Sequence, residues 1–478
     1  MRVTLPLAIF IVSTGFCADA TLEKEATHAL ARAIAYFQSI STRGGYLWWY
    51  SEDLKERAGE NKATESQIWV QPPGTPSVGL ALLRAWEATK DPLHLAAAQA
   101  AAEGLAWGQL ESGGWTYLVD FNPSNQRWYR RAERGSLSEA QISKRRNVTT
   151  FDDDTTQSAL RFLMAAAEAA PTNRQIRAAL EYGLQGLLRA QYPNGGWPQG
   201  FDGRLRKGRV DVSRRAANPE KWSRTPDVKD YWQQYTFNDD AMRDIILTLL
   251  EAHRRYSKPE YLAAVRRGGD FILLAQLPEP QAAWAQQYNF EMEPAWARRF
   301  EPPALCSGET GGIIRTLVDL YLATHDEKYL KPIPSAIEWL ERSQIAPRKW
   351  ARFYELGSNK PLYFTKDYQL VYTDDDLPTH YAFQGEFRIP AAIAFYERVR
   401  QGRGSVESLK REPLNRFNDL TIQRLNALSP SPGPSEARVR EIISTLDPKG
   451  RWIAKGRIES RVFIANVNAL CDYLTTSK

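Results

Sequence analysis

Apolar positions recur along most of the chain at the three- and four-residue spacing of amphipathic helices. Such a pattern buries one face of each helix and leaves the other face polar. The helical segments come in pairs joined by short turns, and four pairs follow one another: 80–88 with 91–107, 157–169 with 174–190, 242–256 with 260–275, and 313–324 with 334–343. The pairing predicts consecutive helical hairpins.

Each hairpin is followed by the same short signature, a glutamine and then, after a turn, a tryptophan. These residues are Gln109 and Trp115, Gln191 and Trp197, Gln276 and Trp284, and Gln344 and Trp350. Recurrence of one unit indicates a repeat architecture, in which each unit buries its apolar face against the next. Residues 22–39 predict a further outer helix, and a weaker copy of the turn surrounds Trp452.

Consecutive hairpins of this kind close into a ring of inner and outer helices, so the predicted fold class is all-α, an α/α toroid. The inner helices would begin on one rim, where long loops would build a groove: 116–151, 198–237, 285–306 and 351–386. We assign residues 21–402 to the toroid. The Ser-, Pro-, Asn- and Arg-rich composition of residues 403–434 predicts an irregular segment, and residues 435–478 have the pattern of further helices. We expect the whole of 403–478 to pack on the toroid, and the sequence indicates no role for it.

The first twenty residues have the composition of an export signal. Arg2 precedes the apolar stretch 5–12, and Ala18-Asp19-Ala20 fits the small-x-small rule for cleavage. A buried helix is the alternative for residues 1–20. We expect an exported, soluble protein, periplasmic or secreted, whose remaining cysteines, Cys306 and Cys471, could pair although nothing in the sequence requires it.

Composition and charge narrow the function classes. The chain of 478 residues carries a net charge of +6, which favours polyanionic partners. It has no basic run or nucleic-acid-binding motif, no further apolar stretch that could span a membrane, and no histidine pair with metal-ligand spacing. Aromatic residues make up 11%, which suits a groove for sugar rings. We therefore expect a monomer that binds an acidic polysaccharide.

Carboxylates cluster where three predicted inner helices begin. They are Asp152-Asp153-Asp154, Asn238-Asp239-Asp240 and Glu309. Helix capping explains one acid per helix, because Asp and Asn accept hydrogen bonds from free backbone amides. Three successive aspartates repel one another unless a proton or cation lies between them. If the clusters converge on one rim, they form an oxygen-rich site suited to Ca²⁺.

Arginines flanked by aromatic residues follow the third and fourth turns. The segments are Ala297-Arg298-Arg299-Phe300-Glu301 and Ala351-Arg352-Phe353-Tyr354-Glu355. One interpretation is a surface ion pair with the nearby glutamate, which contributes little stability. The other is a guanidinium fork that binds a substrate carboxylate.

Four segments of the chain, in this order, together resemble the helical pectate lyases, polysaccharide lyase family ten. The resemblance covers about residues 22–400. They are Asn194-Gly-Gly-Trp-Pro-Gln199, Tyr235-Thr-Phe-Asn-Asp-Asp-Ala241, Pro294-Ala-Trp-Ala-Arg-Arg-Phe-Glu-Pro-Pro303 and Trp350-Ala-Arg-Phe-Tyr-Glu-Leu356. The resemblance implies an α/α toroid that cleaves polygalacturonate by calcium-assisted β-elimination to 4,5-unsaturated oligogalacturonides.

The resemblance also implies roles for particular residues. Arg298 would be the catalytic base, and Ca²⁺ would be the cofactor. Asp152 and either Asp239 or Asp240 would hold the calcium, and Arg352 would contact the substrate. We add Asp153 to the candidate metal ligands, which are then Asp152, Asp153, Asp239 and Asp240, and we add Arg299, Trp197 and Asn238 to the candidate substrate contacts. An arginine base is physically demanding because its side chain normally stays protonated. Arg298 would otherwise stabilise the enolate electrostatically while another group, such as a lysine, removes the proton.

One position departs from the family pattern, in which the residue at Asp152 is followed by Asn-Gly-Ala. Here Asp153, Asp154 and Thr155 follow. The two additional carboxylates would strengthen a cation site or alter the substrate preference.

Three other functions are compatible with a toroid. The turns Gln109-x-x-x-Gly113-x-Trp115 and Gln191-x-x-x-Gly195-x-Trp197 match those of terpene cyclases, but Phe151 stands where the cyclase acid motif requires Asp. A glycoside hydrolase could use Asp154 and Asp240 as its acid and base. A non-catalytic carbohydrate-binding toroid would not require the arginine motifs.

Overall fold

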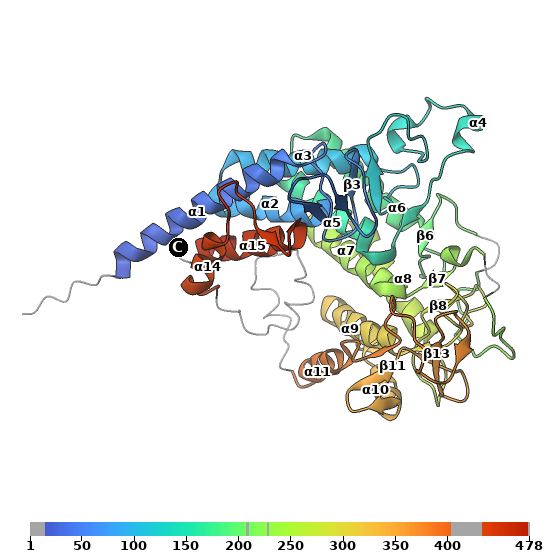
Figure 1. The fold of residues 1–478 in the computed structure, drawn as a ribbon. Helices are drawn as coiled ribbons and strands as arrows, with labels where there is room; N and C mark the ends of the chain where they lie inside the picture. Colours follow the sequence, from blue (N-terminus) through green and yellow to red (C-terminus); the bar gives the residue numbers. More distant parts are fainter. Residues whose placement is uncertain (1–14, 207–209, 227–228, 403–432, 477–478) are drawn as a thin grey trace, which may run out of the picture.

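The computed structural model of the protein describes residues 15–206, 210–226, 229–402 and 433–476 (Figure 1). Residues 1–14 of the predicted export signal and most of the predicted irregular segment lie outside the described residues. The longer helices are α1 (Gly15–Ser39), α2 (Thr75–Thr89), α3 (Pro92–Gly108), α5 (Thr155–Ala169), α6 (Arg174–Arg189), α7 (Ala241–Tyr256), α8 (Pro259–Ala275), α9 (Ser307–Thr324), α10 (Ile333–Arg342), α11 (Ile389–Arg400), α14 (Glu436–Ser444) and α15 (Ser460–Thr476).

The helices form hairpins whose inner members pack side by side. Helices α2 and α3, α5 and α6, α7 and α8, and α9 and α10 pair within hairpins. Across hairpins, the inner helices contact one another in the order α15, α2, α5, α7, α9, α11. This arrangement is the predicted α/α toroid, and within the described residues no comparable contact joins α11 to α15, so the ring stays open. Among these residues no helix is long and apolar enough to cross a membrane.

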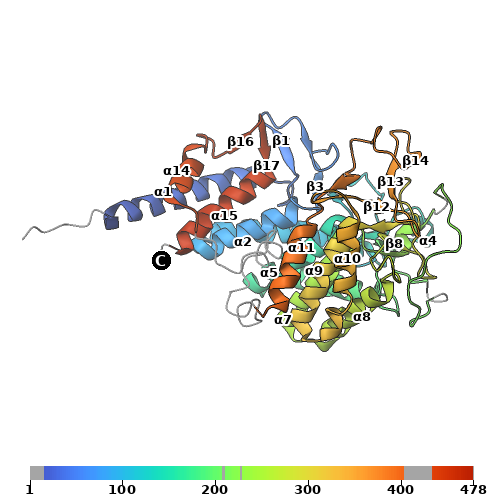
Figure 2. The same ribbon diagram turned by 90° about the horizontal axis from the view of Figure 1, so that it is seen from below.

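Short strands gather on one side of the helices, as Figure 2 shows. They form antiparallel sheets with the orders β16-β17-β1-β2, β10-β11-β15, β14-β13-β12-β9, β3-β4, β5-β6 and β7-β8. Their bounds are β1 (Trp49–Ser51), β2 (Arg57–Ala58), β3 (Gln67–Trp69), β4 (Leu118–Asp120), β5 (Thr149–Thr150), β6 (Gly200–Phe201), β7 (Tyr235–Thr236), β8 (Gln287–Tyr288), β9 (Leu305–Cys306), β10 (Gln344–Ala346), β11 (Lys349–Ala351), β12 (Phe353–Tyr354), β13 (Pro361–Phe364), β14 (Leu370–Val371), β15 (Gln384–Gly385), β16 (Ile453–Ala454) and β17 (Arg457–Glu459).

The repeated glutamine and tryptophan have structural roles. Every signature tryptophan is buried, and its indole N–H donates to a backbone carbonyl near the end of the preceding outer helix: Trp115 to Leu105, Trp197 to Leu187, Trp284 to Ile272, Trp350 to Leu340 and Trp452 to Ile442. The side-chain amide of Gln109 donates within its own turn to Gly113 and across to Ala179 of the next outer helix. The likeness to the cyclase turn therefore has a structural cause.

The same repeat fixes the starts of the inner helices on one rim. Strands β5, β7 and β9 each end just before an inner helix, and each pairs with a strand that follows the next signature tryptophan. Backbone hydrogen bonds between successive repeats therefore hold the residues before α5, α7 and α9 side by side. The C-terminal α15 packs against α2, and α1 packs against α14 and α15.

Candidate active site

The residues before α5 and α7 share an unusual backbone conformation. Asp153 and Asp154 have φ angles of 52° and 56°, and Asp239 and Asp240 have φ angles of 47° and 59°. A left-handed residue other than glycine costs roughly 1–3 kcal/mol, and Asp and Asn tolerate this region better than most side chains. The Asp-Asp pairs therefore suit these turns, including the one where the family pattern has Asn-Gly.

Capping does not explain these aspartates. Asp154 and Asp240 are the N-cap residues of α5 and α7, but neither side chain accepts a capping hydrogen bond from the backbone amides of its helix. The Asp154 carboxylate instead forms an ion pair with the Arg161 side chain of α5. The capping interpretation is thus wrong for both helices.

Three of the predicted metal-binding aspartates come together. Asp152, Asp153 and Asp239, here called the acid cluster, each offer a carboxylate oxygen within 4.8 Å of the others. The Asn238 side-chain amide donates to Asp152 at 2.9 Å and to Asp239 at 2.8 Å, and the Tyr117 hydroxyl donates to Asp152 at 3.1 Å. Asn238 therefore holds two members of the acid cluster together.

The acid cluster is electrostatically unfavourable when all of its members are ionised. Burial, then the charges of Asp152 and Asp239, raises the pKa of Asp153 to about 7. Burial and the charge of Asp152 raise the pKa of Asp239 to about 6, and burial raises the pKa of Asp152. Carboxylate oxygens are the ligands that hard divalent cations prefer, and a cation between them would remove this repulsion.

Arg298 lies beside the acid cluster and is paired on two sides. Its Nε and Nη2 donate to the two carboxylate oxygens of Glu301 at 2.9 and 2.7 Å, and Nη2 lies 3.6 Å from an Asp239 oxygen. Burial lowers the pKa of Arg298, but the hydrogen bonds and charge of Glu301, with the charge of Asp152, outweigh burial and raise it. Because Glu301 is only 2% exposed, this is not a surface ion pair.

Arg352 and Glu309 lie on the α9 side of the acid cluster. The Arg352 Nε donates to the Ala382 carbonyl at 2.7 Å, and its guanidinium stacks on Tyr381 and Phe387, 4.5 and 4.8 Å from the ring centroids. Burial of Glu309, with the charges of nearby aspartates, raises its pKa well above the usual range. The site thus places the guanidinium groups of Arg298 and Arg352 close to a group of carboxylic acids.

The structure decides against one ion pair that the sequence left open and against one predicted substrate contact. Glu355 pairs with Arg224 at 2.5 Å and accepts from the Tyr372 hydroxyl at 2.6 Å, so it is not the partner of Arg352. Trp197 is fully buried beneath its repeat turn, which corrects its prediction as a substrate contact. The signature that suggested Trp197 is a packing signal, and a packed core residue presents no face to a ligand.

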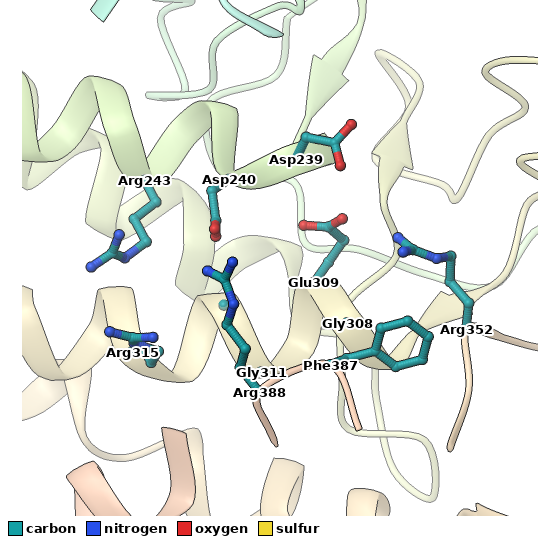
Figure 3. A pocket seen from close by; sticks show the side chains of 11 residues that line it. Asp239, Asp240, Arg243, Gly308, Glu309, Gly311, Arg315, Arg352, Phe387 and Arg388 are labelled. Atoms are coloured by element: carbon teal, nitrogen blue, oxygen red, sulfur yellow. The ribbon is translucent and has the colours of Figure 1, made fainter. Parts of the chain in front are cut away.

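The other predicted residues lie at the margin of the site. Arg299 is exposed and stacks on Tyr368, 3.6 Å from its ring centroid. Asp240 lies outside the acid cluster and lines a neighbouring pocket (Figure 3). Cys306 and Cys471 are both buried free thiols.

Sequence reasoning missed several residues that shape the site. Tyr117 and Tyr381 reach it from loops between repeats, and Tyr381 donates to Glu301 at 3.2 Å. Arg243 and Arg388 line the pocket beside Asp240. Single aromatic or arginine residues in long loops or inside helices give no local signal, because only the packing of the ring brings them to the rim.

Comparison with known families agrees with this architecture. The family profile described as pectic acid lyase matches residues 109–349, which is half of the chain and includes the acid cluster and Arg298. The chain belongs to the pectic acid lyase family, and it is a polysaccharide lyase. No curated protein matches it.

Solved structures that it resembles are distant. The family 10 polysaccharide lyase from Cellvibrio cellulosa is 19% identical, with 68% of this chain and 96% of that chain covered and a TM-score of 0.46. Cellobiose 2-epimerase from Spirochaeta thermophila is 13% identical, with coverage of 98% and 100% and a TM-score of 0.43. The GH76 α-mannanase from Bacteroides thetaiotaomicron is 12% identical, with 96% of both chains covered and a TM-score of 0.42.

Proposed function

We propose that the protein is a calcium-dependent pectate lyase that cleaves polygalacturonate by β-elimination. The observation that carries the proposal is the acid cluster beside Arg298, in a chain of the pectic acid lyase family. In the reaction a base removes the proton from C5 of a uronate, the C4–O4 bond breaks, and a C4=C5 double bond forms while the departing O4 takes up a proton. The product is an oligosaccharide with an unsaturated end.

The acid cluster fits a calcium ion chemically. Its members supply carboxylate oxygens within reach of one another, and Ca²⁺ takes six to eight oxygen ligands, leaving positions for water and a substrate carboxylate. The pKa values of Asp153 and Asp239 are raised by burial and by repulsion between the carboxylates, and a divalent cation would relieve that repulsion. Bound calcium would neutralise the uronate carboxylate and so acidify the C5 proton.

The guanidinium groups would orient the substrate and stabilise developing charge. Arg298, held protonated by Glu301, is suited to stabilise the enolate that forms as the C5 proton leaves. We assign it this electrostatic role rather than that of the base, because the acids around it favour its charged form. Arg352 is held by Ala382 and the rings of Tyr381 and Phe387, which suits a fixed contact to a substrate carboxylate.

The experiment measures unsaturated product from polygalacturonate by its near-ultraviolet absorbance, with and without a chelator. We expect calcium-dependent absorbance in the wild type, little in Asp239→Ala, and wild-type activity in Asp367→Ala, an exposed aspartate between β13 and β14. Calorimetry without substrate should show calcium binding to the wild type and weaker binding to Asp239→Ala. Saturated products only, or activity that survives chelation, would contradict the proposal.

We also propose export of the protein with cleavage after Ala20. The cut would fall within α1 and leave Leu22, which is fully buried, in the mature chain. Amino-terminal sequencing of the exported protein checks this position, and a mature protein that retains residues 1–20 would contradict it.

A further inference from the structure

One tyrosine lies between the two arginines of the candidate active site. The ring centroid of Tyr381 is 4.5 Å from the guanidinium carbon of Arg352 and 5.9 Å from that of Arg298. Its hydroxyl donates to the Glu301 Oε1 at 3.2 Å, and the same oxygen accepts from Arg298 Nη2 at 2.7 Å. A cation within about 6 Å of an aromatic ring is attracted to the face of that ring. Tyr381 therefore contacts Arg352 with its ring and reaches Arg298 through Glu301.

The backbone around Tyr381 is held by the same contact between segments that holds Arg352. Strand β15, which follows Tyr381 closely, pairs with β11, which ends just before Arg352. Beside this pair the Arg352 backbone N–H donates to the Phe383 carbonyl and the Arg352 Nε donates to the Ala382 carbonyl, both at 2.7 Å. A shift of Tyr381 relative to Arg352 would disrupt these hydrogen bonds, so the ring and the guanidinium keep their relative position.

The ring of Tyr381 also packs against the segment that carries Arg298. Its centroid lies 4.9 Å from that of Phe300, which stands between Arg298 and Glu301 in the sequence. Burial, with the charge of Glu301, raises the pKa of Tyr381 well above its usual range against the opposing charge of Arg352, so the hydroxyl stays protonated. A protonated hydroxyl that donates to a carboxylate makes a charge-assisted hydrogen bond, which is stronger than one between neutral groups.

We propose that Tyr381 is a positioning residue for the elimination: its hydroxyl orients Glu301, and through it the Arg298 fork, while its ring holds Arg352. The inference rests on the proposed function, in which Arg298 stabilises the enolate and Arg352 contacts a substrate carboxylate. Tyr381 lies beyond residues 109–349, which the family profile matches. Its two parts would serve different steps, so loss of the hydroxyl should affect turnover and loss of the ring should also affect substrate binding.

Steady-state kinetics of two variants on polygalacturonate separate the hydroxyl from the ring. Tyr381→Phe loses only the hydroxyl, so kcat should fall about tenfold while KM stays within about twofold of the wild type. Tyr381→Leu should show the same loss of kcat and a rise in KM of about fivefold, because no ring remains beside Arg352. Tyr363→Phe is the matched control, since it removes the hydroxyl of another buried tyrosine of the segment 351–386, on β13, and should keep wild-type kinetics.

A further comparison tests whether the hydroxyl acts through Arg298. In an Arg298→Ala background, adding Tyr381→Phe should lower kcat no further, because the group that the hydroxyl positions is gone. A hydroxyl that contacted the substrate itself would lower kcat there as much as it does in the wild type. Circular dichroism and urea denaturation check that each variant folds, and if Tyr381→Leu does not fold, Tyr381→Phe and the double variant decide the outcome.

The outcomes separate this inference from the proposed function. Unchanged kcat in Tyr381→Phe, an undiminished loss in the Arg298→Ala background, or equal KM in folded Tyr381→Leu and Tyr381→Phe would overturn the positioning role, while an active wild type would leave the proposed function in place. A wild type that releases no unsaturated product would overturn the proposed function and this role with it.

Discussion

Replacing Asp153 by Asn should stabilise the calcium-free protein at neutral and alkaline pH. Burial, with the charges of Asp152 and Asp239, raises the pKa of Asp153 to about 7 from an ordinary 3.8. A group with a raised pKa in the folded state contributes stability below pH 4 that is lost as the pH rises through about 7. Asn cannot ionise, keeps a similar shape, and tolerates the left-handed backbone at this position.

The magnitude follows from the difference between the two pKa values. A difference of about three is worth about 4 kcal/mol, at about 1.4 kcal/mol for each unit. Because Asp153 is partly exposed and its neighbours titrate with it, water and coupled protonation reduce this to about 2 kcal/mol. Asp153→Asn should therefore unfold with a free energy about 2 kcal/mol higher than the wild type at pH 8, and with a smaller gain at pH 5.

Urea denaturation in the presence of a chelator measures this difference, with the exposed Asp367→Asn as the matched control. Excess calcium should reverse the order, because a cation that binds the folded state stabilises the wild type more than the variant. Equal stability of wild type and Asp153→Asn at pH 8, or the same gain in Asp367→Asn, would refute the account of the acid cluster.

The remaining predictions concern the arginines and the buried tryptophan. Arg298→Ala should lower kcat about 10²–10³-fold with little change in KM, and Arg298→Lys should recover only part, because it lacks the planar fork that Glu301 binds. Arg352→Ala should mainly raise KM, since it removes a contact that substrate and transition state share. Trp197→Phe should cost about 1–3 kcal/mol of stability, through the unpaired Leu187 carbonyl and lost volume, and leave the kinetics of the folded enzyme unchanged. Steady-state kinetics on polygalacturonate check the kinetic outcomes, and urea denaturation checks the stability of Trp197→Phe. The predictions would be contradicted by a near wild-type kcat in Arg298→Ala, by an unchanged KM in Arg352→Ala, or by an altered KM in Trp197→Phe.

Local patterns in the sequence are enough to predict the helical repeat and the rim at which the candidate functional residues lie. Helical periodicity and the recurring glutamine and tryptophan are local signals, since each reports a helix face or a turn that the chain forms with its immediate neighbours. Their position relative to the repeat also identified the two Asp-rich turns and the Arg298 and Arg352 segments as candidate parts of a site. It failed for Trp197, because a repeated aromatic residue looks alike whether it packs in a core or faces a ligand.

The contacts between these groups could not be predicted from local patterns, because they depend on how the repeats pack together. Strand pairing between repeats brings Asp152 and Asp239 together, 87 positions apart in the chain, and leaves Asp240 outside the acid cluster. The sequence suggested the pairing of Arg298 with Glu301, but only the packing of the chain buries Glu301 and assembles a pocket from arginines that lie on separate elements. Such contacts depend on the order and tilt of whole helices, and long-range packing leaves no spacing in the sequence from which they could be read.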